Sequence, residues 1–265
     1  MSETSSTTQS GKGKYGTAKI AGLMRRANSL AERGQYDEAI AQIKEAIAIC
    51  PQEPKCSIQL ANLYRAQNKM GPAIEAMKKA VDLDPTDSST LEQLLQVLVE
   101  LGHYDEAIAR GRRMLKRFPR NLFARDILGI AYLQQGKIDE SLRVTNELIR
   151  LAPSDPAHHF KKAVLLQQKG EISQAMAAFT RALDMDPQGD MADDAREAIA
   201  ALDSYQLRQI LTLAVEDVVF RTKLVLDPES ASQERGFLLS AGGVLALRQI
   251  DLESLPGDAR FRYYH

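Results

Sequence analysis

The side chains that usually carry chemistry are few in this chain and poorly spaced for it. Cys50 and Cys56 are the only cysteines, which is too few for a disulfide framework. We expect both thiols to stay reduced and to pack where helices meet. His158 and His159 are adjacent, so on a helix they would point about 100° apart and could not bind one ion together. The sequence therefore predicts no metal site.

One segment superficially resembles a phosphate-binding loop, the sequence GKGKYGT at residues 11–17. It lacks the required spacing, and no apolar strand precedes it. The chain also has no nucleophile elbow, dinucleotide fingerprint or zinc-binding pair. Its many carboxylates fall on the polar faces of predicted helices, where solvation explains them. We therefore predict that the protein is not an enzyme and uses no cofactor.

Basic side chains gather in one segment, which contains no acidic residue from position 107 to position 125. A solvated helix face, an acidic protein partner and nucleic acid are the three interpretations of this segment. Nucleic acid is the weakest of them, because aromatic side chains suited to base stacking do not alternate with the cations. We call these cations the basic patch: Arg110, Arg112, Arg113, Lys116, Arg117, Arg120 and Arg125.

An acidic stretch lies further along the chain, where only Arg196 relieves the negative charge. Its members are Asp184, Asp186, Asp190, Asp193, Asp194, Glu197 and Asp203. Copies of the chain could pair head to tail through the two opposite patches and form a homo-oligomer. Exposed ion pairs contribute only about 0–1 kcal/mol each, so charge would steer such association without holding it together.

An internal repeat reveals the elements that position these residues. Prolines recur at positions 51, 85, 119, 153 and 187, always 34 residues apart. Seventeen residues before each proline stand Gly34, Asn68, Gly102, Gly136 and Gly170. Two positions between each of these turn residues and the following proline also repeat. The first is occupied by Ala39, Ala73, Ala107, Ser141 and Ala175, and the second by Ala46, Ala80, Met114, Leu148 and Ala182. Columns that hold their register over five units indicate one repeated supersecondary element.

Each unit is predicted to be a pair of amphipathic helices. In the second helix, apolar residues recur at helical spacing and charged residues occupy the opposite side. In the first unit we expect Asp37 to cap this helix, and Gly34 to end the preceding helix with a positive φ. The alanines allow two helix backbones to approach closely. The proline ends the second helix, because it has no amide hydrogen and disfavours helix in the residue before it.

The period, the glycine, the alanines and the proline resemble those of the tetratricopeptide repeat family. The resemblance implies an all-α fold, an α-α superhelical solenoid of helix-turn-helix repeats, because one hairpin cannot bury its own apolar stripe and must stack on its neighbours. Such arrays act in many unrelated complexes, so the resemblance implies protein binding without naming a partner. Aligned on these columns, the units span residues 20–53, 54–87, 88–121, 122–155 and 156–189, about two-thirds of the chain.

In that family, set positions of each first helix line a concave binding face. Carried over to this chain, the positions include Asn28, Asn62, Arg65, Gln96, Phe123, Ile127, Ile130, Leu133, Phe160 and Val164. We call these residues the predicted groove. It would change from polar to apolar along the array, and the apolar part could bind an amphipathic helix or a short apolar motif. The chain's own C-terminal helices could fill the apolar part instead.

The two ends of the chain depart from the repeat. Residues 1–18 are polar and aperiodic, which predicts a disordered tail. Residues 190–265 are predicted to form a capping helix followed by a C-terminal helical module, since a solenoid needs a polar-faced end to stay soluble. Within this part, Ser204 is expected to cap a long apolar helix.

Helix signals divide the last part of the chain further. Asp227 is expected to cap a short helix that has Pro228 at its first position. Gly236 should end that helix, and Ser240 should begin another. Three aromatic residues near the C-terminus would dock against the array or a partner: Phe261, Tyr263 and Tyr264.

Residues 220–240 are similar to leader modules of some ribosomal peptide precursors and to helices of certain ring-opening dioxygenase small subunits. This similarity implies an alternative function, that of a maturation or delivery factor for a peptide or an enzyme subunit. The factor would act through residues 204–265.

Composition is compatible with a protein-binding role. The chain has 265 residues and a formal net charge of −1, so its average charge suggests no particular polyanionic or polycationic partner. It has no apolar run of about eighteen residues, so we expect no membrane span. The polar start lacks the apolar segment of a secretory signal, so we expect a cytoplasmic location. The leading hypothesis is a non-enzymatic scaffold or adaptor that binds protein partners, through the predicted groove and the C-terminal module.

Overall fold

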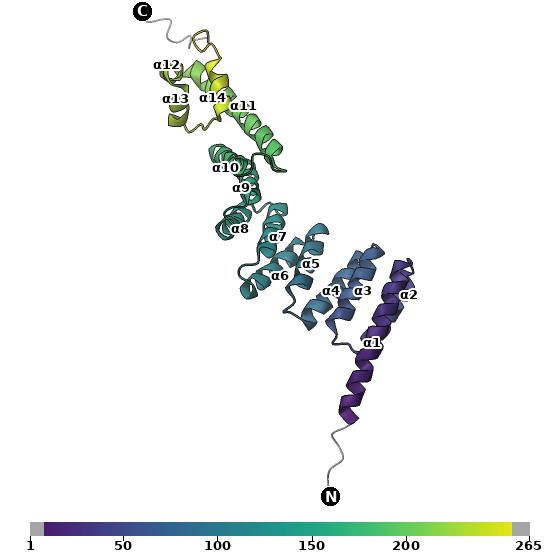
Figure 1. Ribbon diagram of the computed structural model, residues 1–265. Coiled ribbons are helices and arrows are strands. Elements are labelled where there is room, and N and C mark those ends of the chain that lie inside the picture. The colour runs from purple at the N-terminus through teal and green to yellow at the C-terminus, as the bar shows by residue number, and fades with distance from the viewer. Residues whose placement is uncertain (1–7, 256–265) are drawn as a thin grey trace, which may run out of the picture. The chain divides into compact units, whose positions relative to one another are not determined.

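The structure is a computed structural model that describes residues 8–255, with side chains from residue 17 onward. Within that range every regular element is an α-helix and no strand occurs (Figure 1), which confirms the predicted all-α fold. The helices are α1 (Thr8–Glu32), α2 (Tyr36–Ile49), α3 (Pro54–Ala66), α4 (Met70–Leu83), α5 (Ser88–Glu100), α6 (Tyr104–Arg117), α7 (Leu122–Gln134), α8 (Ile138–Leu151), α9 (Pro156–Lys169), α10 (Ile172–Met185), α11 (Ala192–Glu216), α12 (Val218–Leu226), α13 (Pro228–Glu234) and α14 (Ala241–Arg248).

The chain divides into two compact units, Met1–Ile127 and Leu128–His265. We call them the N-terminal unit and the C-terminal unit; α7 begins in the first and ends in the second. In each unit, helices that follow one another in sequence pack together, as α3 does with α4 and α9 with α10. Each unit is therefore a stack of helical hairpins, the architecture of an α-solenoid.

A residue with left-handed backbone ends the first helix of each hairpin. Gly34 has a φ of 76° and Gly102 a φ of 77°. Glycine adopts these values without steric cost because it has no Cβ. Asn68, with a φ of 57°, is the one non-glycine residue of the described range that does the same, and asparagine tolerates this region better than most side chains. The prediction that the turn residue ends the first helix with a positive φ is therefore confirmed.

The column of small side chains is buried between the paired helices. Its alanines are all fully buried: Ala39, Ala73, Ala107 and Ala175. Ser141 takes the same position in the fourth unit and is also buried. Its Oγ donates a hydrogen bond to the carbonyl oxygen of Gly129 at 2.8 Å. The serine is therefore compatible with the core because its hydroxyl has a partner there.

The second helix of each hairpin ends two residues before the repeated proline. In the first unit α2 ends at Ile49, and the backbone of Cys50 is no longer helical (φ −137°, ψ 88°) before Pro51. Proline disfavours helical backbone in the residue before it. The same ending recurs at α4, α6, α8 and α10, which confirms the predicted stop.

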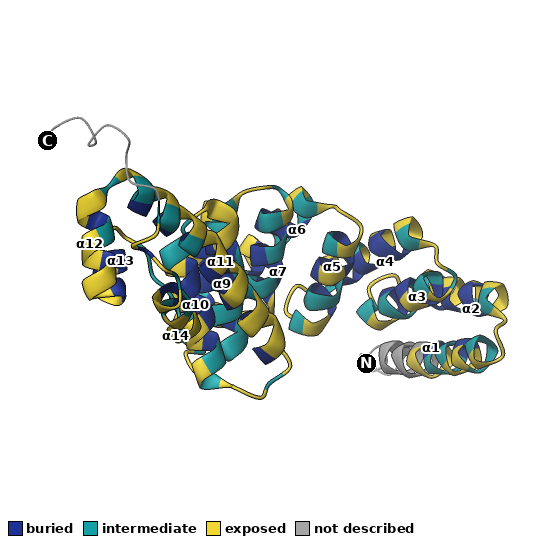
Figure 2. Cartoon of the chain, turned by 90° about the horizontal axis from the view of Figure 1, so that it is seen from above, coloured by how far each residue is buried: buried dark blue, intermediate teal, exposed yellow. Residues whose placement is uncertain are grey.

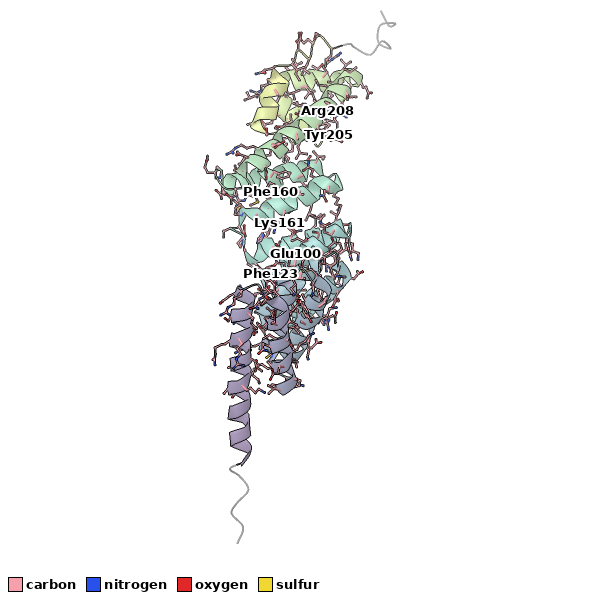
Figure 3. The ribbon with its side chains drawn as sticks, turned by 90° about the vertical axis from the view of Figure 1, so that its right-hand side faces the viewer. Glu100, Phe123, Phe160, Lys161, Tyr205 and Arg208 are labelled. Atoms are coloured by element: carbon pink, nitrogen blue, oxygen red, sulfur yellow. The ribbon has the colours of Figure 1, made fainter. Side chains whose placement is uncertain are left out.

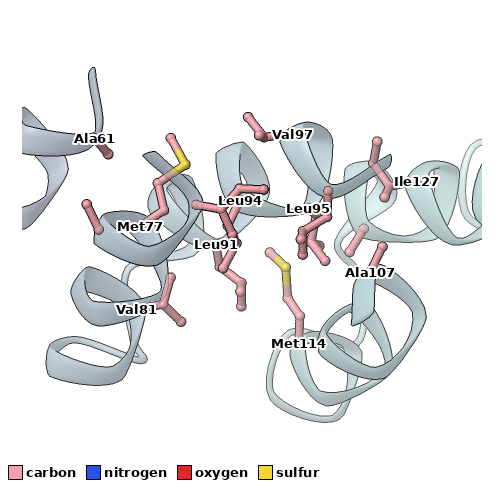
Figure 4. Close-up of a cluster of buried hydrophobic side chains, with 14 residues drawn as sticks. Ala61, Met77, Val81, Leu91, Leu94, Leu95, Val97, Ala107, Met114 and Ile127 are labelled. Carbon is pink, nitrogen blue, oxygen red and sulfur yellow. The ribbon is translucent and has the colours of Figure 1, made fainter. Parts of the chain in front are cut away.

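Two apolar clusters hold the N-terminal unit together. One joins α1, α2 and α3 through side chains such as Leu23, Ile43 and Leu63. The other runs from α3 to the start of α7 and includes Met77 and Leu94 (Figure 4). Figure 2 shows the buried residues on the faces that the helices turn toward one another. Fully burying one such side chain contributes about 1.5–3 kcal/mol, so these clusters are the main source of stability.

Two further clusters form the core of the C-terminal unit. The first joins α8, α9, α10 and α11 around Phe179 and Met176. The second joins α11 to the short helices α12, α13 and α14 around Ile210, Phe220 and Leu247. We call residues 217–255 the C-terminal module; they lie within the predicted C-terminal helical module. Because α11 contributes to both clusters, it joins the last hairpin to this module.

Two buried polar side chains of α11 anchor the C-terminal module. Gln206 forms two hydrogen bonds with the backbone of Leu238: its Nε2 donates to the carbonyl oxygen at 2.8 Å, and its Oε1 accepts from the amide at 2.9 Å. Asp203 accepts hydrogen bonds from both the amide and the hydroxyl of Ser240. Removing either partner would leave a buried polar group unsatisfied, so the docking position of this segment is specific.

The helix boundaries of the C-terminal unit differ from the prediction in one respect. α11 is continuous, so the predicted start at Ser204 is wrong. The Ser204 hydroxyl donates to the carbonyl oxygen of Ala200 at 2.9 Å, and a serine satisfied in this way can stay within a helix. The break falls at Asp217, which caps α12 by accepting a hydrogen bond from the amide of Phe220 at 2.9 Å.

The remaining helix signals of the C-terminal module are confirmed. α13 begins at Pro228 after the cap residue Asp227. Gly236 follows that helix with a φ of 84°. Ser240 caps α14, because its Oγ accepts a hydrogen bond from the amide of Gly243 at 3.2 Å.

Asp37 is not the cap that the sequence predicted. The cap position of α2 is Gln35, and Asp37 lies in the first turn. Its Oδ1 accepts a hydrogen bond from Nε2 of Gln67 at 2.9 Å and lies 3.8 Å from Nζ of Lys69. The hydrogen bond from Gln67, helped by the charge of Lys69, lowers the pKa of Asp37. The carboxylate therefore links two successive hairpins.

α1 begins earlier than the repeat predicts. Its backbone is helical from Thr8, so residues 8–18 differ from the predicted disordered tail. Residues from Ile20 onward pack in the apolar cluster with α2, and adding residues to an existing helix costs less free energy than starting one. Residues 1–7 lie outside the described residues, as do the predicted docking aromatics Phe261, Tyr263 and Tyr264.

Gly243 allows α14 to approach α11 closely. A Cβ atom at this position would lie 2.4 Å from Oδ1 of Asp203. We expect Gly243→Ala to lower the free energy of unfolding by about 1–3 kcal/mol, as overpacking does, because Asp203 would have to move away from Ser240. Urea denaturation measures this change, and faster amide exchange in α14 would locate it.

The neighbouring glycine provides the matched control. A Cβ atom at Gly242 would have only Oγ of Ser240 nearby, at an ordinary contact distance of 3.5 Å. Gly242→Ala should keep or raise stability, since alanine is more favourable than glycine in a helix by about 1 kcal/mol. If the two variants were equally stable, the close approach of α14 to Asp203 would be wrong.

Candidate protein-binding surfaces

The polar part of the predicted groove lies on the first helices of the N-terminal unit. Asn28 of α1, Asn62 of α3 and Gln96 of α5 are exposed, and Arg65 of α3 is half-buried. Nε2 of Gln96 donates a hydrogen bond to Oε1 of Glu100 at 2.9 Å within the same helix. Three successive first helices therefore each present an amide side chain to the surface.

Gln59 also belongs to this face, although it is not part of the predicted groove. Its Nε2 donates hydrogen bonds to Oδ1 of Asn28 and, at 3.1 Å, to the carbonyl oxygen of Met24, which joins α1 to α3. Its Oε1 is buried and has no hydrogen-bond partner in the described part of the chain. Gln59 precedes Asn62 by three residues and so shares its helix face, a spacing that could have revealed it.

The structure divides the apolar part of the predicted groove between core and surface. Ile127 is only 7% exposed and belongs to the core of the N-terminal unit, so it is not available to a partner. It follows the fully buried Ala124 by three residues and shares its inward face. Phe123 is 37% exposed at the start of α7. In the C-terminal unit, Ile130 and Leu133 are half-buried.

Phe160 and Val164 pack against the core of the C-terminal unit together with Leu133. The ring of Phe160 stands edge-on to that of Phe179, with centroids 5.3 Å apart. Leu238 of the C-terminal module packs against the same cluster. The module therefore contributes to the core on which these groove residues lie. Figure 3 shows Phe160 and its neighbour Lys161 on α9.

Three arginines of the basic patch line a pocket in the N-terminal unit. The pocket has a volume of about 320 Å³ and lies among α4, α5 and α6. Arg110, Arg113 and Arg117 share one face of α6, because their spacing of three and four residues is helical. The full lining is Val81, Asp82, Pro85, Leu91, Arg110, Arg113, Met114, Arg117 and Phe118. The sequence pattern predicts the group of cations but gives no sign of the apolar residues that α4 and α5 add.

The other cations of the patch lie elsewhere. Arg112, Lys116 and Arg120 are exposed and do not line the pocket. Arg125 is half-buried, and its guanidinium donates a hydrogen bond to the carbonyl oxygen of Asn121 at 3.4 Å. Of the basic patch, only Arg110, Arg113 and Arg117 therefore line the pocket.

Glu106 connects α4 to α6 beside this pocket. Its carboxylate lies 2.9 Å from Nζ of Lys78 and 2.8 Å from Nε of Arg110. Burial by itself would raise the pKa of Glu106, but the hydrogen bonds from Lys78 and Arg110 outweigh burial and lower it. The same bond to Glu106 raises the pKa of Lys78. Both groups are therefore charged at neutral pH.

The C-terminal module exposes an apolar face on α12. Val219 is 69% exposed and Leu226 is 80% exposed, and Val218 and Val225 are also exposed. An open pocket of about 700 Å³ adjoins them, and its rim carries more carboxylates than cations. The pocket is lined by Leu224, Val225, Leu226, Asp227, Pro228, Glu229, Leu247, Arg248, Ile250, Asp251, Leu252 and Glu253.

The potential metal ligands of the described residues form no group of three or more that could hold an ion. Cys50 and Cys56 lie in one apolar cluster of the N-terminal unit, where α1, α2 and α3 meet, as their predicted packing requires. Burial raises the pKa of Cys56. His158 is buried, and burial lowers the pKa of His159. None of the helices in the described range is both long and apolar enough to cross a bilayer.

Models of known families match three stretches of the chain. Two of the models, both described as tetratricopeptide repeat, match residues 128–200 and 92–156. A third, described as anaphase-promoting complex, cyclosome, subunit 3, matches residues 32–110. Together they match more than half of the chain. The chain belongs to the tetratricopeptide repeat family.

Curated relatives of this tetratricopeptide repeat protein are much longer than the chain itself. It is 26% identical over 181 residues to aspartyl/asparaginyl beta-hydroxylase of Mus musculus, a match to 64% of this chain and 24% of that protein. It is 28% identical over 131 residues to superkiller complex protein 3 of Homo sapiens, a match to 49% of this chain and 8% of that protein. The chain spans a quarter or less of these relatives, so their names establish neither an activity nor a partner for it.

Solved structures of tetratricopeptide repeat proteins share the fold. Residues 41 to the end of MamA from Desulfovibrio magneticus RS-1 superpose with a TM-score of 0.55 at 18% identity, covering 65% of this chain and 97% of that chain. YrrB, described as a TPR protein with an unusual peptide-binding site, superposes with a TM-score of 0.54 at 19% identity, covering 66% and 90%. At these identities the likeness shows the fold alone. Proteins of this family generally mediate protein–protein interactions.

The ion pairs of Glu106 predict a pH-dependent stability. Because folding lowers the pKa of Glu106, these pairs stabilise the protein above the carboxyl's unfolded pKa of about 4.3, and the stabilisation is lost as pH falls through the folded pKa. We expect Glu106→Gln to lower the free energy of unfolding by about 0.5–1 kcal/mol at pH 7. The difference from the wild type should disappear in acid, as urea denaturation at several pH values would show.

Glu75 provides the matched control for this experiment. Its carboxylate lies 3.1 Å from the same Nζ of Lys78, but its side chain is 73% exposed, against 33% for Glu106. Solvent screens an exposed pair more strongly, so Glu75→Gln should change stability less. A Glu106→Gln effect of the same size at pH 3 and pH 7 would contradict the role of these ion pairs.

Proposed function

We propose that this protein is a non-enzymatic adaptor that binds a segment of a partner protein on the first-helix face of its N-terminal unit. The family supports the general class of function. The observation that carries the specific site is the row of exposed amide side chains on α1, α3 and α5: Asn28, Asn62 and Gln96.

The chemistry of this face suits an extended peptide. An amide side chain both donates and accepts hydrogen bonds, so it can pair with the peptide groups of a bound segment without requiring one side chain. Arg65, half-buried on α3, adds a cation for a carboxylate. Such a face would bind mainly the peptide backbone of the partner segment and would depend less on the sequence of that segment.

A photo-crosslinking residue placed at Asn62 tests the site. We expect it to capture a defined partner in native cells, because Asn62 is exposed at the centre of the proposed face. The same residue at Lys79, which is exposed on the second helix α4, is the control and should not capture that partner. The double variant Asn62→Ala/Arg65→Ala should reduce recovery of the partner at least tenfold in a pull-down. Equal capture from both positions would reject the face.

The apolar face of α12 favours a second candidate function, a delivery factor that holds a peptide or an enzyme subunit on the C-terminal module. Val219 and Leu226 are strongly exposed, and exposed apolar patches of this kind mark interaction sites. The carboxylates on the rim of the neighbouring pocket would favour a partner segment that is apolar and basic. This function uses different residues from the adaptor face, so the two can be tested separately.

Charged substitutions on α12 discriminate between the two functions. Val219→Lys with Leu226→Lys should abolish partner binding if the module is the binding site, because both side chains are exposed and a cation there would prevent apolar contact. Gln233→Lys, exposed on α13 of the same module, adds the same type of charge and should have no effect. Unchanged binding by the double variant would exclude the delivery function and leave the adaptor face.

A further inference from the structure

The arginine-lined pocket of the N-terminal unit lies apart from the proposed adaptor face. Its walls come mainly from the second helices α4 and α6, with Leu91 from α5 and Pro85 from the linker between α4 and α5. The adaptor face lies on the first helices α1, α3 and α5. The pocket therefore requires an explanation of its own.

The floor of the pocket is apolar and belongs to the core. Met114 is 1% exposed, Val81 is 7% exposed and Leu91 is 8% exposed. Phe118 adds a partly buried ring. These side chains are held by the packing of the hairpins, so the floor is pre-formed. A volume of about 320 Å³ is at the small end for ligand sites and suits one large apolar side chain.

The cations around this floor are incompletely neutralised. Arg110 is paired with Glu106 at 2.8 Å. Hydrogen bonds from Thr86 are the main cause of the lowered pKa of Asp84, and the nearby charge of Arg117 adds to the effect. Arg113 is exposed and has no hydrogen bond or ion pair with any described residue. Arg113 is thus available to an anion, and Arg117 lies near the half-buried carboxylate of Asp84. The exposed carboxylate of Asp82 also lines the pocket, but the three arginines outnumber it.

We propose that this pocket binds an acidic peptide segment of a partner protein, which inserts one apolar or aromatic side chain and presents flanking carboxylates to Arg113 and Arg117. The apolar floor supplies affinity through burial. The guanidinium groups supply charge-assisted hydrogen bonds, which are stronger than neutral ones. The two together select a segment in which an apolar residue stands between acidic ones.

Two observations favour an acidic peptide over nucleic acid. The pocket has a floor of core side chains and room for one apolar group, whereas single-stranded nucleic acid needs successive aromatic platforms along a basic groove. The cations that lie outside the pocket, such as Lys116 and Arg120, do not continue its rim. A phosphate-bearing side chain shares the chemistry of a carboxylate, so a phosphorylated peptide belongs to the same class of ligand.

Fluorescence anisotropy with the full chain and short labelled peptides tests the proposal. The probe has a phenylalanine between two pairs of glutamates, and its comparison peptide has serine in place of phenylalanine. We expect the phenylalanine peptide to bind at least tenfold more tightly, because only its ring reaches the apolar floor. A phosphotyrosine peptide and a single-stranded oligonucleotide of the same charge complete the set. The phosphotyrosine peptide should bind at least as tightly as the phenylalanine peptide, and the oligonucleotide should bind at least tenfold more weakly.

Arg113→Ala and Arg120→Ala form the matched pair of variants. Both side chains are exposed and both changes remove one charge, but only Arg113 lines the pocket. Arg113→Ala should weaken binding of the phenylalanine peptide at least fivefold, whereas Arg120→Ala should change it less than twofold. Neither residue belongs to the adaptor face, so loss of binding here leaves the proposed function untouched.

Several results would contradict the proposal that this pocket binds an acidic peptide. Equal weakening by the two variants would show that only the overall charge attracts the peptide. Equal affinity of the phenylalanine and serine peptides would show that the floor is not used. Tighter binding of the oligonucleotide, with loss on Arg113→Ala, would assign the patch to nucleic acid. If no peptide bound at millimolar concentration, the proposal that the pocket binds acidic peptides would be rejected.

Discussion

A hairpin of two helices has an apolar stripe that it cannot bury by itself, and both units are built around this constraint. Each hairpin covers the stripe of its neighbour, and the fit depends on small side chains where the helices meet. Ala107 and Ala175 are completely buried at this position, and Ser141 is accepted there because Gly129 receives its hydrogen bond. Glycine or asparagine with positive φ then reverses the chain so that the next helix returns along the same stack.

Because the inner faces are used for stacking, only the outer faces remain exposed to solvent. The first helices of the N-terminal unit present amide groups, which suit a peptide backbone. The second helices present arginines beside an apolar floor, which suit a different segment. Glu106 lies between α4 and α6 and forms ion pairs with both Arg110 and Lys78, whereas Arg113 has no ion pair with a described residue. One packing scheme thus provides two surfaces of different chemistry.

The last hairpin of a stack needs a cover for its apolar side, and here the chain supplies one. α11 packs on α10 and then carries the C-terminal module. The contact is made specific by polar groups, since Gln206 and Asp203 hold the backbone at Leu238 and Ser240. Leu238 enters the same core as the last hairpins. The module is therefore a structural end to the stack as well as a surface that exposes apolar residues on α12.

The sequence alone determined the all-α class, the hairpin period, the turn glycines and the caps at Asp227 and Ser240, because each depends on local backbone preference or on spacing within one helix. Tertiary structure decided the rest. Asp37 pairs with Gln67 instead of capping its own helix, and Ile127 turns into the core. Arg113 gains a pocket only because α4 and α5 bring Val81 and Leu91 beside it. Such contacts join residues about 20–30 positions apart. A local sequence pattern cannot predict them, because they depend on how the hairpins stack.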